Sequence, residues 1–229
     1  MVLAAGKGTR MRPLTATQPK PLVRVAGKPL IAHALDRLSE AGIARAVVNV
    51  HYLADALEAY LEERREPEIA LSDERAQLLE TGGGLIHARS QLPDPFFCLN
   101  SDNIWLDGPK NAFADLSARW NAEQMDALLL VVPHGQARNF EGKGDFHLDA
   151  VGRVARRKPG RIAPFIYTGI QIVSHRLLRD APEGPFSTNI LWNRALEEGR
   201  LFGVPFTGEW FEVGTPEAIA PTEQALLRG

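Results

Sequence analysis

A glycine-rich loop directly after a short apolar run is the first feature of this chain that could bind phosphate. The loop, Gly6–Arg10, follows Leu3–Ala5 at the start of the sequence. Glycines after a strand let the backbone approach a phosphate closely, so that successive N–H groups can bind its oxygens. Arg10 and Arg12 add positive charge where the oxygens of a triphosphate would lie. The pattern favours a phosphate-binding loop.

This loop does not match two common phosphate-binding motifs. A P-loop requires Lys followed by Ser or Thr after its second glycine, whereas Gly8 is followed by Thr9 and Arg10. A dinucleotide-binding loop requires a third small residue at the position that Met11 occupies. The glycines taken alone fit an ordinary turn between a strand and a helix equally well.

Lys20 is a second candidate for contact with phosphate. It lies between Pro19 and Pro21, and the fixed φ of proline makes the backbone on both sides stiff. Its ammonium group is therefore held near one place. A solvated surface lysine is the alternative.

Two acidic residues could bind a magnesium ion. Asp102 follows the apolar run Phe96–Leu99, and Glu212 lies between an apolar run and a predicted helix start. Side chains at the carboxyl ends of parallel strands meet where open α/β sheets bind ligands. Chemistry at a phosphate group needs charge neutralisation, which Mg²⁺ provides when one or two carboxylates hold it. An Asx-type turn is the alternative for Asp102.

The run Glu80–Gly84 contains three consecutive glycines at a predicted helix start. Glycine is unfavourable in a helix, so we expect a flat ligand to pack against the bare backbone there. Gln77, just before the run, could hydrogen-bond the edge of a pyrimidine. A flexible loop or a cap is the alternative.

Composition excludes several classes of function. The net charge of −2 lacks the basic excess of a nucleic-acid-binding protein. No run approaches 18 apolar residues, so no contact with a membrane is expected. The single cysteine, Cys98, lies in an apolar run and is predicted to be a buried, inert thiol. No zinc or serine-hydrolase motif is present. We expect a cytoplasmic enzyme.

Short apolar runs alternate with amphipathic segments along the first half. Runs apolar on both faces predict buried strands at residues 1–5, 46–50, 96–100 and 127–132. Spacing of 3.6 residues predicts helices over 29–41, 53–65 and 110–122, and another begins at Thr81 or Gly82. This alternation predicts an α/β fold with a mostly parallel sheet and helices on both faces.

The second half is more mixed. Residues 145–174 predict two or three strands, and residues 187–199 and 215–228 predict helices. No linker or internal repeat divides the chain. We expect one domain over 1–229, with a nucleotide-binding half over about 1–132. The half over about 133–229 would bind the second substrate and include a small inserted lobe.

The run Leu3–Pro13, followed by Pro19–Val23, resembles the signature of the sugar-1-phosphate nucleotidyltransferases. The resemblance implies a Rossmann-like, glycosyltransferase-A-like fold and Mg²⁺ as cofactor. It implies transfer of a nucleoside monophosphate from an NTP to a sugar 1-phosphate, with release of pyrophosphate. Arg10 and Lys20 would contact the reacting phosphates. Asp102 and Glu212 match the metal-binding positions, although most members carry aspartate where this chain has Glu212.

The resemblance also implies two sets of binding residues. Those that would contact the nucleotide are Leu3, Ala4, Ala5, Gly6, Gly8, Thr9, Arg10, Gln77 and Gly82. Those that would contact the sugar phosphate are Asn100, Gly144, Lys158, Thr168 and Asn189. For Asn189, a turn cap is an equal alternative.

The form of two motifs resembles one branch of this family, the N-acetylmuramate-1-phosphate uridylyltransferases. These motifs are Glu80–Gly84 and Gly144–Phe146. The expected substrates are therefore UTP and N-acetylmuramate 1-phosphate. We expect the protein to be a monomer or a homodimer. GTP with mannose 1-phosphate, or with a related heptose phosphate, is the first alternative. A catalytically silent nucleotide-binding paralogue is the second, and only Glu212 favours it.

Overall fold

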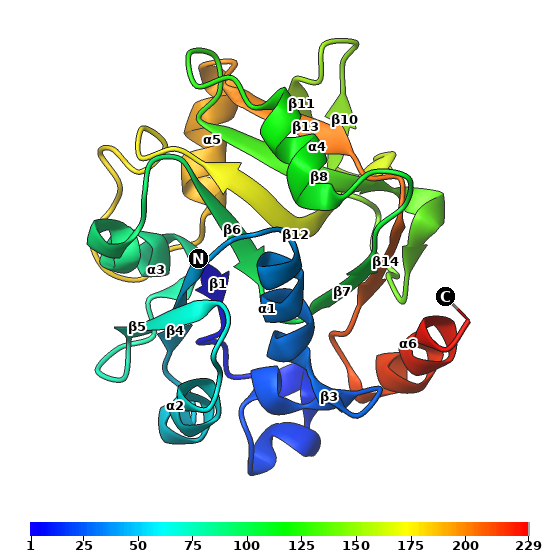
Figure 1. Ribbon diagram of the computed structural model, residues 1–229. Helices are drawn as coiled ribbons and strands as arrows, with labels where there is room; N and C mark the ends of the chain where they lie inside the picture. The colour runs from blue at the N-terminus through cyan, green and yellow to red at the C-terminus, as the bar shows by residue number, and fades with distance from the viewer. Residues whose placement is uncertain (229) are drawn as a thin grey trace.

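A nine-stranded sheet runs through the centre of the computed structural model, which describes residues 1–228 (Figure 1). Four of its strands pair in parallel in the order β6-β1-β4-β5. They are β1 (Val2–Leu3), β4 (Arg45–Val50), β5 (Glu68–Asp73) and β6 (Phe96–Asn100). Their carboxyl ends therefore open at one edge of the sheet.

The second half of the chain extends the same sheet. The long strand β12 pairs antiparallel with both β6 and β8, and β13 pairs parallel with β8. A hairpin of β10 and β11 joins the other end of β12. These strands are β8 (Ala127–Pro133), β10 (Phe146–Leu148), β11 (Val154–Arg156), β12 (Phe165–Val173) and β13 (Leu201–Pro205).

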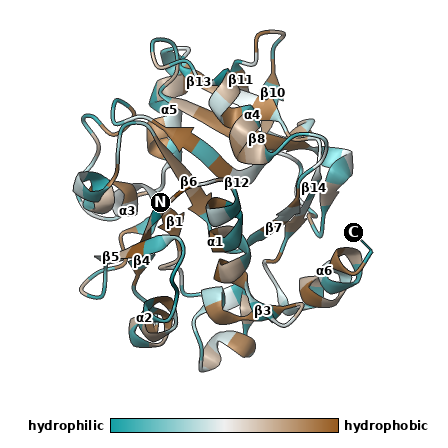
Figure 2. Ribbon diagram, in the orientation of Figure 1, coloured by the Kyte–Doolittle hydropathy of each residue, from teal (hydrophilic) through white to brown (hydrophobic). Residues whose placement is uncertain are grey.

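Helices cover both faces of the sheet, which explains why its strands are apolar on both sides (Figures 1 and 2). Val48 packs with one group of helices and its neighbour Val47 with the other, and Leu128 and Leu129 alternate in the same way. The first group is α1 (Leu30–Glu40), α2 (Ala54–Glu62) and α4 (Ala112–Arg119). The second is α3 (Glu80–Ala88) and α5 (Asn189–Glu197).

A three-stranded sheet lies beside the main one. Its order is β7-β14-β9, from β7 (Asn103–Leu106), β14 (Glu209–Glu212) and β9 (Ala137–Arg138). A third apolar cluster, which includes Met11, Leu30 and Phe211, joins this sheet to the N-terminal loop. The last helix, α6 (Ile219–Leu226), packs on the same cluster. The remaining strands, β2 (Arg24–Val25) and β3 (Lys28–Pro29), form a short hairpin.

The predicted α/β fold is confirmed, with its mostly parallel sheet and all four strands predicted in the first half. The segment 215–228 differs from the single predicted helix, because a 3₁₀ turn at Pro216–Ala218 precedes α6. Several strands were not predicted from the sequence. Among them are β5, whose exposed and half-buried residues lack a continuous apolar run, and the short strands β2, β3, β7, β9, β13 and β14. In the described residues, no helix combines the length and apolar character that a membrane crossing needs.

Candidate functional site

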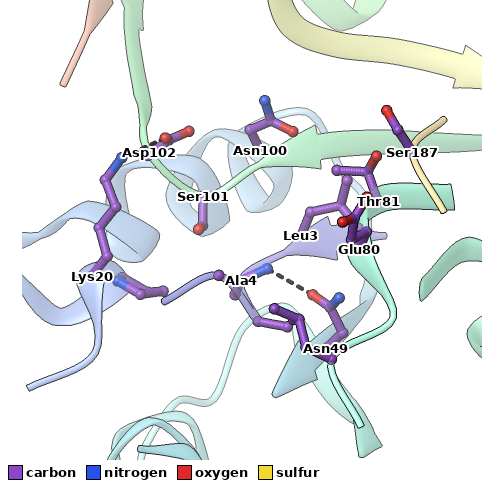
Figure 3. A pocket seen from close by; sticks show the side chains of 14 residues that line it. Leu3, Ala4, Lys20, Asn49, Glu80, Thr81, Asn100, Ser101, Asp102 and Ser187 are labelled. Atoms are coloured by element: carbon purple, nitrogen blue, oxygen red, sulfur yellow. Dashed lines mark hydrogen bonds and ion pairs between the residues drawn. The ribbon is translucent and has the colours of Figure 1, made fainter. Parts of the chain in front are cut away.

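A cavity of about 410 Å³ opens at the carboxyl ends of β1, β4 and β6 (Figure 3). This is the edge at which open α/β sheets bind ligands. The glycine-rich loop forms one wall, and the turn before α3 forms another. The lining residues are Leu3, Ala4, Ala5, Gly6, Lys20, Pro21, Asn49, Leu78, Glu80, Thr81, Asn100, Ser101, Asp102 and Ser187.

The glycine-rich loop is shaped by Gly8. Its φ is +60°, and a Cβ atom at this position would lie 2.8 Å from the Cβ of Lys20. The Thr15 hydroxyl donates a hydrogen bond of 2.8 Å to the Gly8 carbonyl, which fixes the turn. Gly6 is different, because a Cβ there would have no neighbour within 4 Å. Gly8 therefore lets Lys20 pack against the loop, while Gly6 leaves the cavity wall open.

Lys20 and Asp102 form an ion pair inside the cavity. The Lys20 ammonium donates to the Asp102 carboxylate at 2.6 Å, and the side chains are 13% and 27% exposed. Figure 3 shows Lys20 extending across the cavity toward Asp102. Lys20 begins a 3₁₀ turn, Lys20–Leu22, with Pro21 inside it. The predicted stiff placement of this lysine agrees with that turn.

Arg10 and Glu212 form the corresponding pair in an adjacent cavity of about 620 Å³. The Arg10 guanidinium donates to the Glu212 carboxylate at 3.3 Å, and the side chains are 65% and 26% exposed. Each predicted metal ligand is thus paired with one of the two predicted phosphate-binding cations. The four residues lie in two neighbouring cavities rather than in one.

The backbone holds the two acidic residues close together in the small sheet. Glu212 pairs with Asn103 in the antiparallel register of β14 and β7, and the Val213 N–H donates to the Asp102 carbonyl at 3.4 Å. Carboxylate oxygens are suitable ligands for Mg²⁺, which keeps several of its sites for phosphate oxygens and water. Among residues 1–228, no three His, Cys, Asp or Glu side chains cluster as a metal site. The arrangement fits a metal held jointly by protein and nucleotide.

The three glycines, which were expected to lie under a ligand, are near the start of α3, and the chain itself packs against them. The Gly82 N–H donates to the Phe186 carbonyl at 2.8 Å, and a Cβ at Gly82 would overlap the Phe186 ring. Gly83 packs in the same way against the backbone of Gly184. No ligand is needed to account for these glycines. The contact of Gly82 with nucleotide stays a prediction, and its neighbours Glu80 and Thr81 reach the cavity.

Asn100 and Thr168 lie near each other through a bulge in β12. The register between β12 and β8 shifts between Tyr167 and Gln171, and Gly169 in this bulge has a φ of +82°. A Cβ at Gly169 would lie 2.9 Å from the Asn100 side-chain nitrogen. Asn100 lines the cavity, whereas Thr168 is fully buried and its hydroxyl donates to the Leu130 carbonyl at 2.8 Å. Thr168 therefore shapes the bulge through its own hydrogen bonds.

Some predicted contact residues lie outside the walls of the two cavities, among them Gly8 and Thr9, which begins a 3₁₀ turn over Thr9–Met11. Gly144 adopts a φ of +73° in a turn packed on Ala163, while Lys158 and Gln77 have exposed side chains. Their contacts with substrate stay predictions.

Asn189 lies at the rim of the first cavity. It begins α5, donates to the Ser187 hydroxyl at 3.0 Å and accepts a hydrogen bond of 2.8 Å from Arg156. Ser187 lines the cavity. Asn189 therefore contacts a residue of the cavity wall but does not line the cavity itself. Its contact with a sugar also stays a prediction.

Several cavity residues were not predicted from the sequence. Asn49 is a single polar residue in the apolar run of β4, and this interruption was the available signal. Ser187 and Glu80 enter from turns that only the folded chain brings together. Glu80 has a positive φ of 59°, which no sequence pattern indicates.

Cys98 is buried, as predicted, and it faces away from both cavities in the second apolar cluster. Burial raises the pKa of the Cys98 thiol to about 11, and only weaker contacts oppose this. Such a thiol is protonated at neutral pH and is not a nucleophile.

Comparisons with known proteins agree with this geometry. The sequence profile of the family described as "Nucleotidyl transferase" matches residues 1–229. The chain is 46% identical to N-acetylmuramate alpha-1-phosphate uridylyltransferase of Caulobacter vibrioides, over 99% of this chain and 96% of that protein. It is 33% identical to mannose-1-phosphate guanylyltransferase catalytic subunit beta of Danio rerio, over 95% of this chain but only 61% of that protein.

Solved structures share the fold. The crystal structure of HddC from Yersinia pseudotuberculosis complexed with GMP-PN superposes with a TM-score of 0.78. It covers 98% of this chain and 97% of that chain at 20% identity.

Proposed function

Since this chain belongs to the nucleotidyl transferase family, we propose that it transfers UMP from UTP to N-acetylmuramate 1-phosphate and releases pyrophosphate. The observation that carries this proposal is the pairing of two cations with two carboxylates in the two neighbouring cavities, the first of which opens at the carboxyl edge of the main sheet. Lys20 pairs with Asp102 at 2.6 Å, and Arg10 pairs with Glu212 at 3.3 Å. The two cations can neutralise the negative charge of a triphosphate, and the two carboxylates can serve as ligands of a divalent metal.

The protein acts in this proposal by alignment and electrostatics. An oxygen of the sugar 1-phosphate attacks the α-phosphorus of UTP in line, and pyrophosphate leaves. A phosphate monoester is anionic at neutral pH, so the attack needs no general base. The Ala4–Gly6 backbone binds the triphosphate, while Lys20 and Arg10 exchange their carboxylate partners for phosphate oxygens.

The cofactor in this proposal is Mg²⁺, held by Asp102 and Glu212. A bound metal supplies charge neutralisation at the α-phosphate. Both carboxylates are only about a quarter exposed, and the register of β7 and β14 keeps their backbones together. Glu212 reaches further than an aspartate would, because its side chain has one more methylene group.

The choice of substrates rests on the relatives. The uridylyltransferase from Caulobacter vibrioides matches at higher identity and over nearly its whole length, whereas the guanylyltransferase from Danio rerio is matched over 61% of its length. The motifs Glu80–Gly84 and Gly144–Phe146 favour the same choice. Since UTP is a cytoplasmic metabolite, we place the reaction in the cytoplasm.

Pyrophosphate release in the presence of Mg²⁺ tests this proposal. UTP and GTP are each combined with N-acetylmuramate 1-phosphate and with mannose 1-phosphate. We expect release with UTP and the muramate ester. Release only with GTP and mannose 1-phosphate would support the proposed type of reaction but show that both proposed substrates are wrong. Binding of UTP with no release in any combination would indicate another sugar phosphate or a non-catalytic paralogue, and activity in excess chelator would remove the metal from the proposal.

A further inference from the structure

A series of buried hydrogen bonds runs from Glu74 to Ala4, two residues before the glycine-rich loop. Glu74 and Asn49 are each only 2% exposed. The Asn49 amide nitrogen donates to Glu74 Oε1 at 2.8 Å, and the Ala4 N–H donates to Asn49 Oδ1 at 2.7 Å. The dashed line in Figure 3 marks the second of these bonds. A carboxylate behind the cavity is therefore connected to the backbone that lines it.

The second oxygen of the same carboxylate holds the opposite wall. The Leu79 N–H donates to Glu74 Oε2 at 3.1 Å, and the Gln77 N–H donates to the Glu74 carbonyl at 3.0 Å. Leu78 and Glu80, on either side of Leu79, both line the cavity. One side chain thus joins the phosphate-binding loop to the turn that precedes α3.

Gly84 provides the space that this carboxylate occupies. A Cβ atom at Gly84 would lie 2.8 Å from Glu74 Oε1 and 3.1 Å from the Asn49 amide nitrogen. A side chain at this position would displace the carboxylate from its partners. Gly84 therefore leaves room for the hydrogen bonds between Glu74 and Asn49, whereas Gly82 and Gly83 leave room for the packing of residues 184–186.

The chain of hydrogen bonds has a fixed direction. Ala4 and Leu79 can only donate through their backbone N–H groups, and Glu74 accepts with both oxygens. Asn49 must therefore turn its oxygen to Ala4 and its nitrogen to Glu74. In residues 1–228, Glu74 takes part in no ion pair. A buried carboxylate held only by neutral donors is costly unless every bond is made.

We propose that Glu74 and Asn49 are positioning residues that hold the two walls of the cavity in the geometry that binds the nucleoside triphosphate. The inference rests on the proposed function only for the choice of UTP as donor. Neither residue needs to touch the reacting phosphates. Their effect is to fix the backbone N–H groups of the loop before the donor binds, so that ordering it costs nothing at binding.

The substitution Glu74→Gln tests the inference with almost no change of shape. Glutamine has one acceptor oxygen where two donors must be satisfied, so either Asn49 or Leu79 faces an NH₂ group. We expect amide exchange in the 3–6 and 77–80 segments to become faster. We also expect the KM for UTP to rise about tenfold, equivalent to about 1.4 kcal/mol. The KM for the sugar phosphate should stay within about twofold.

A second variant restores a matching set of donors and acceptors to these buried hydrogen bonds. In Asn49→Asp combined with Glu74→Gln, the new carboxylate accepts from Ala4 and from the glutamine NH₂ group. The glutamine oxygen then accepts from Leu79. Amide-exchange protection and the thermal midpoint should both recover relative to Glu74→Gln, and this comparison stands even if the single variant folds poorly. Glu68→Gln is the matched control, because Glu68 is exposed at the start of β5, the strand that Glu74 directly follows.

Unchanged exchange in both segments and an unchanged KM for UTP in Glu74→Gln would overturn the inference. An equal rise in both KM values would also overturn it, since it would indicate a general loss of structure. If the wild-type protein binds no UTP, the proposed function fails. Amide exchange in the two variants would then still decide whether Glu74 and Asn49 hold the cavity walls.

Discussion

Removal of the Lys20 ammonium should strengthen the binding of metal alone while it weakens catalysis. In Lys20→Met, Asp102 loses the partner that donates to it at 2.6 Å. In the wild-type protein, a metal that binds Asp102 must displace the Lys20 ammonium. A bound triphosphate would make this easier, because its oxygens can bind the ammonium instead. The methionine side chain keeps the packing against Gly8 without the charge.

The size of this effect follows from the pair itself. A hydrogen bond between charged groups contributes about 1.5–3 kcal/mol. The pair is 13% and 27% exposed, so solvent screens part of its energy and the lower end of the range applies. Since 1.4 kcal/mol is a factor of about ten, we expect Mg²⁺ or Mn²⁺ to bind about tenfold more tightly without nucleotide. Turnover should fall by about 10² or more, as when a donor to developing charge is lost.

Calorimetric titration of the metal into nucleotide-free protein measures this affinity directly. Lys7→Met is the matched control, because Lys7 is an exposed lysine of the neighbouring glycine-rich loop, and it should leave the metal affinity unchanged. Weaker or unchanged metal binding by Lys20→Met would refute the reasoning, since Lys20 would then not compete with the metal for Asp102. Full turnover by this variant would remove Lys20 from the reaction.

Three further outcomes follow from the structure. Gly8→Ala should raise the KM for UTP and lower the thermal midpoint, because its Cβ would lie 2.8 Å from that of Lys20 at a φ of +60°, whereas Gly6→Ala should change the midpoint little. The pKa of Asp36 lies below its ordinary value of 3.8. Burial alone would raise this pKa, but the hydrogen bonds that Lys28 and Arg64 donate to the carboxylate lower it by more. The folded state therefore holds this proton less tightly than the unfolded state. The stability that Asp36 adds over Asp36→Asn in urea unfolding should be full near pH 7 and decline as pH falls below about 3.8. Burial raises the pKa of Cys98 to about 11, so the thiol should react with a colorimetric disulfide reagent at pH 8 only in unfolding urea.

Residues whose placement depends on a short stretch of chain were predictable from the sequence. Lys20 sits in its own turn between two prolines, and Asp102 follows its strand by two residues. In both cases the local pattern also determines where the side chain goes. The apolar strands that carry Asp102 and the glycine-rich loop were predictable for the same reason.

Residues that act through distant partners could not be predicted in this way. Glu74 reaches Asn49 only because β5 pairs with β4 in a register that sets Asp73 opposite Val50. That register depends on the packing of the whole sheet, and β5 itself has a weak apolar pattern. The pairing of Arg10 with Glu212 likewise joins residues 202 positions apart.

The run Glu80–Gly84 shows that a motif can need glycine because of contacts within the protein. Its glycines were expected to lie under a ligand, and the structure explains them by contacts with Phe186, Gly184 and Glu74. A sequence indicates that a side chain is excluded from a position. It does not indicate whether a ligand or the protein itself fills the space.

In the proposed reaction, the sugar phosphate attacks the α-phosphorus of UTP. Mass spectrometry of the products formed from N-acetylmuramate 1-phosphate with ¹⁸O in its phosphate tests this most directly. We expect UDP-N-acetylmuramate that retains all of the label, together with unlabelled pyrophosphate. Label in the pyrophosphate, or formation of UMP without a nucleotide sugar, would contradict it.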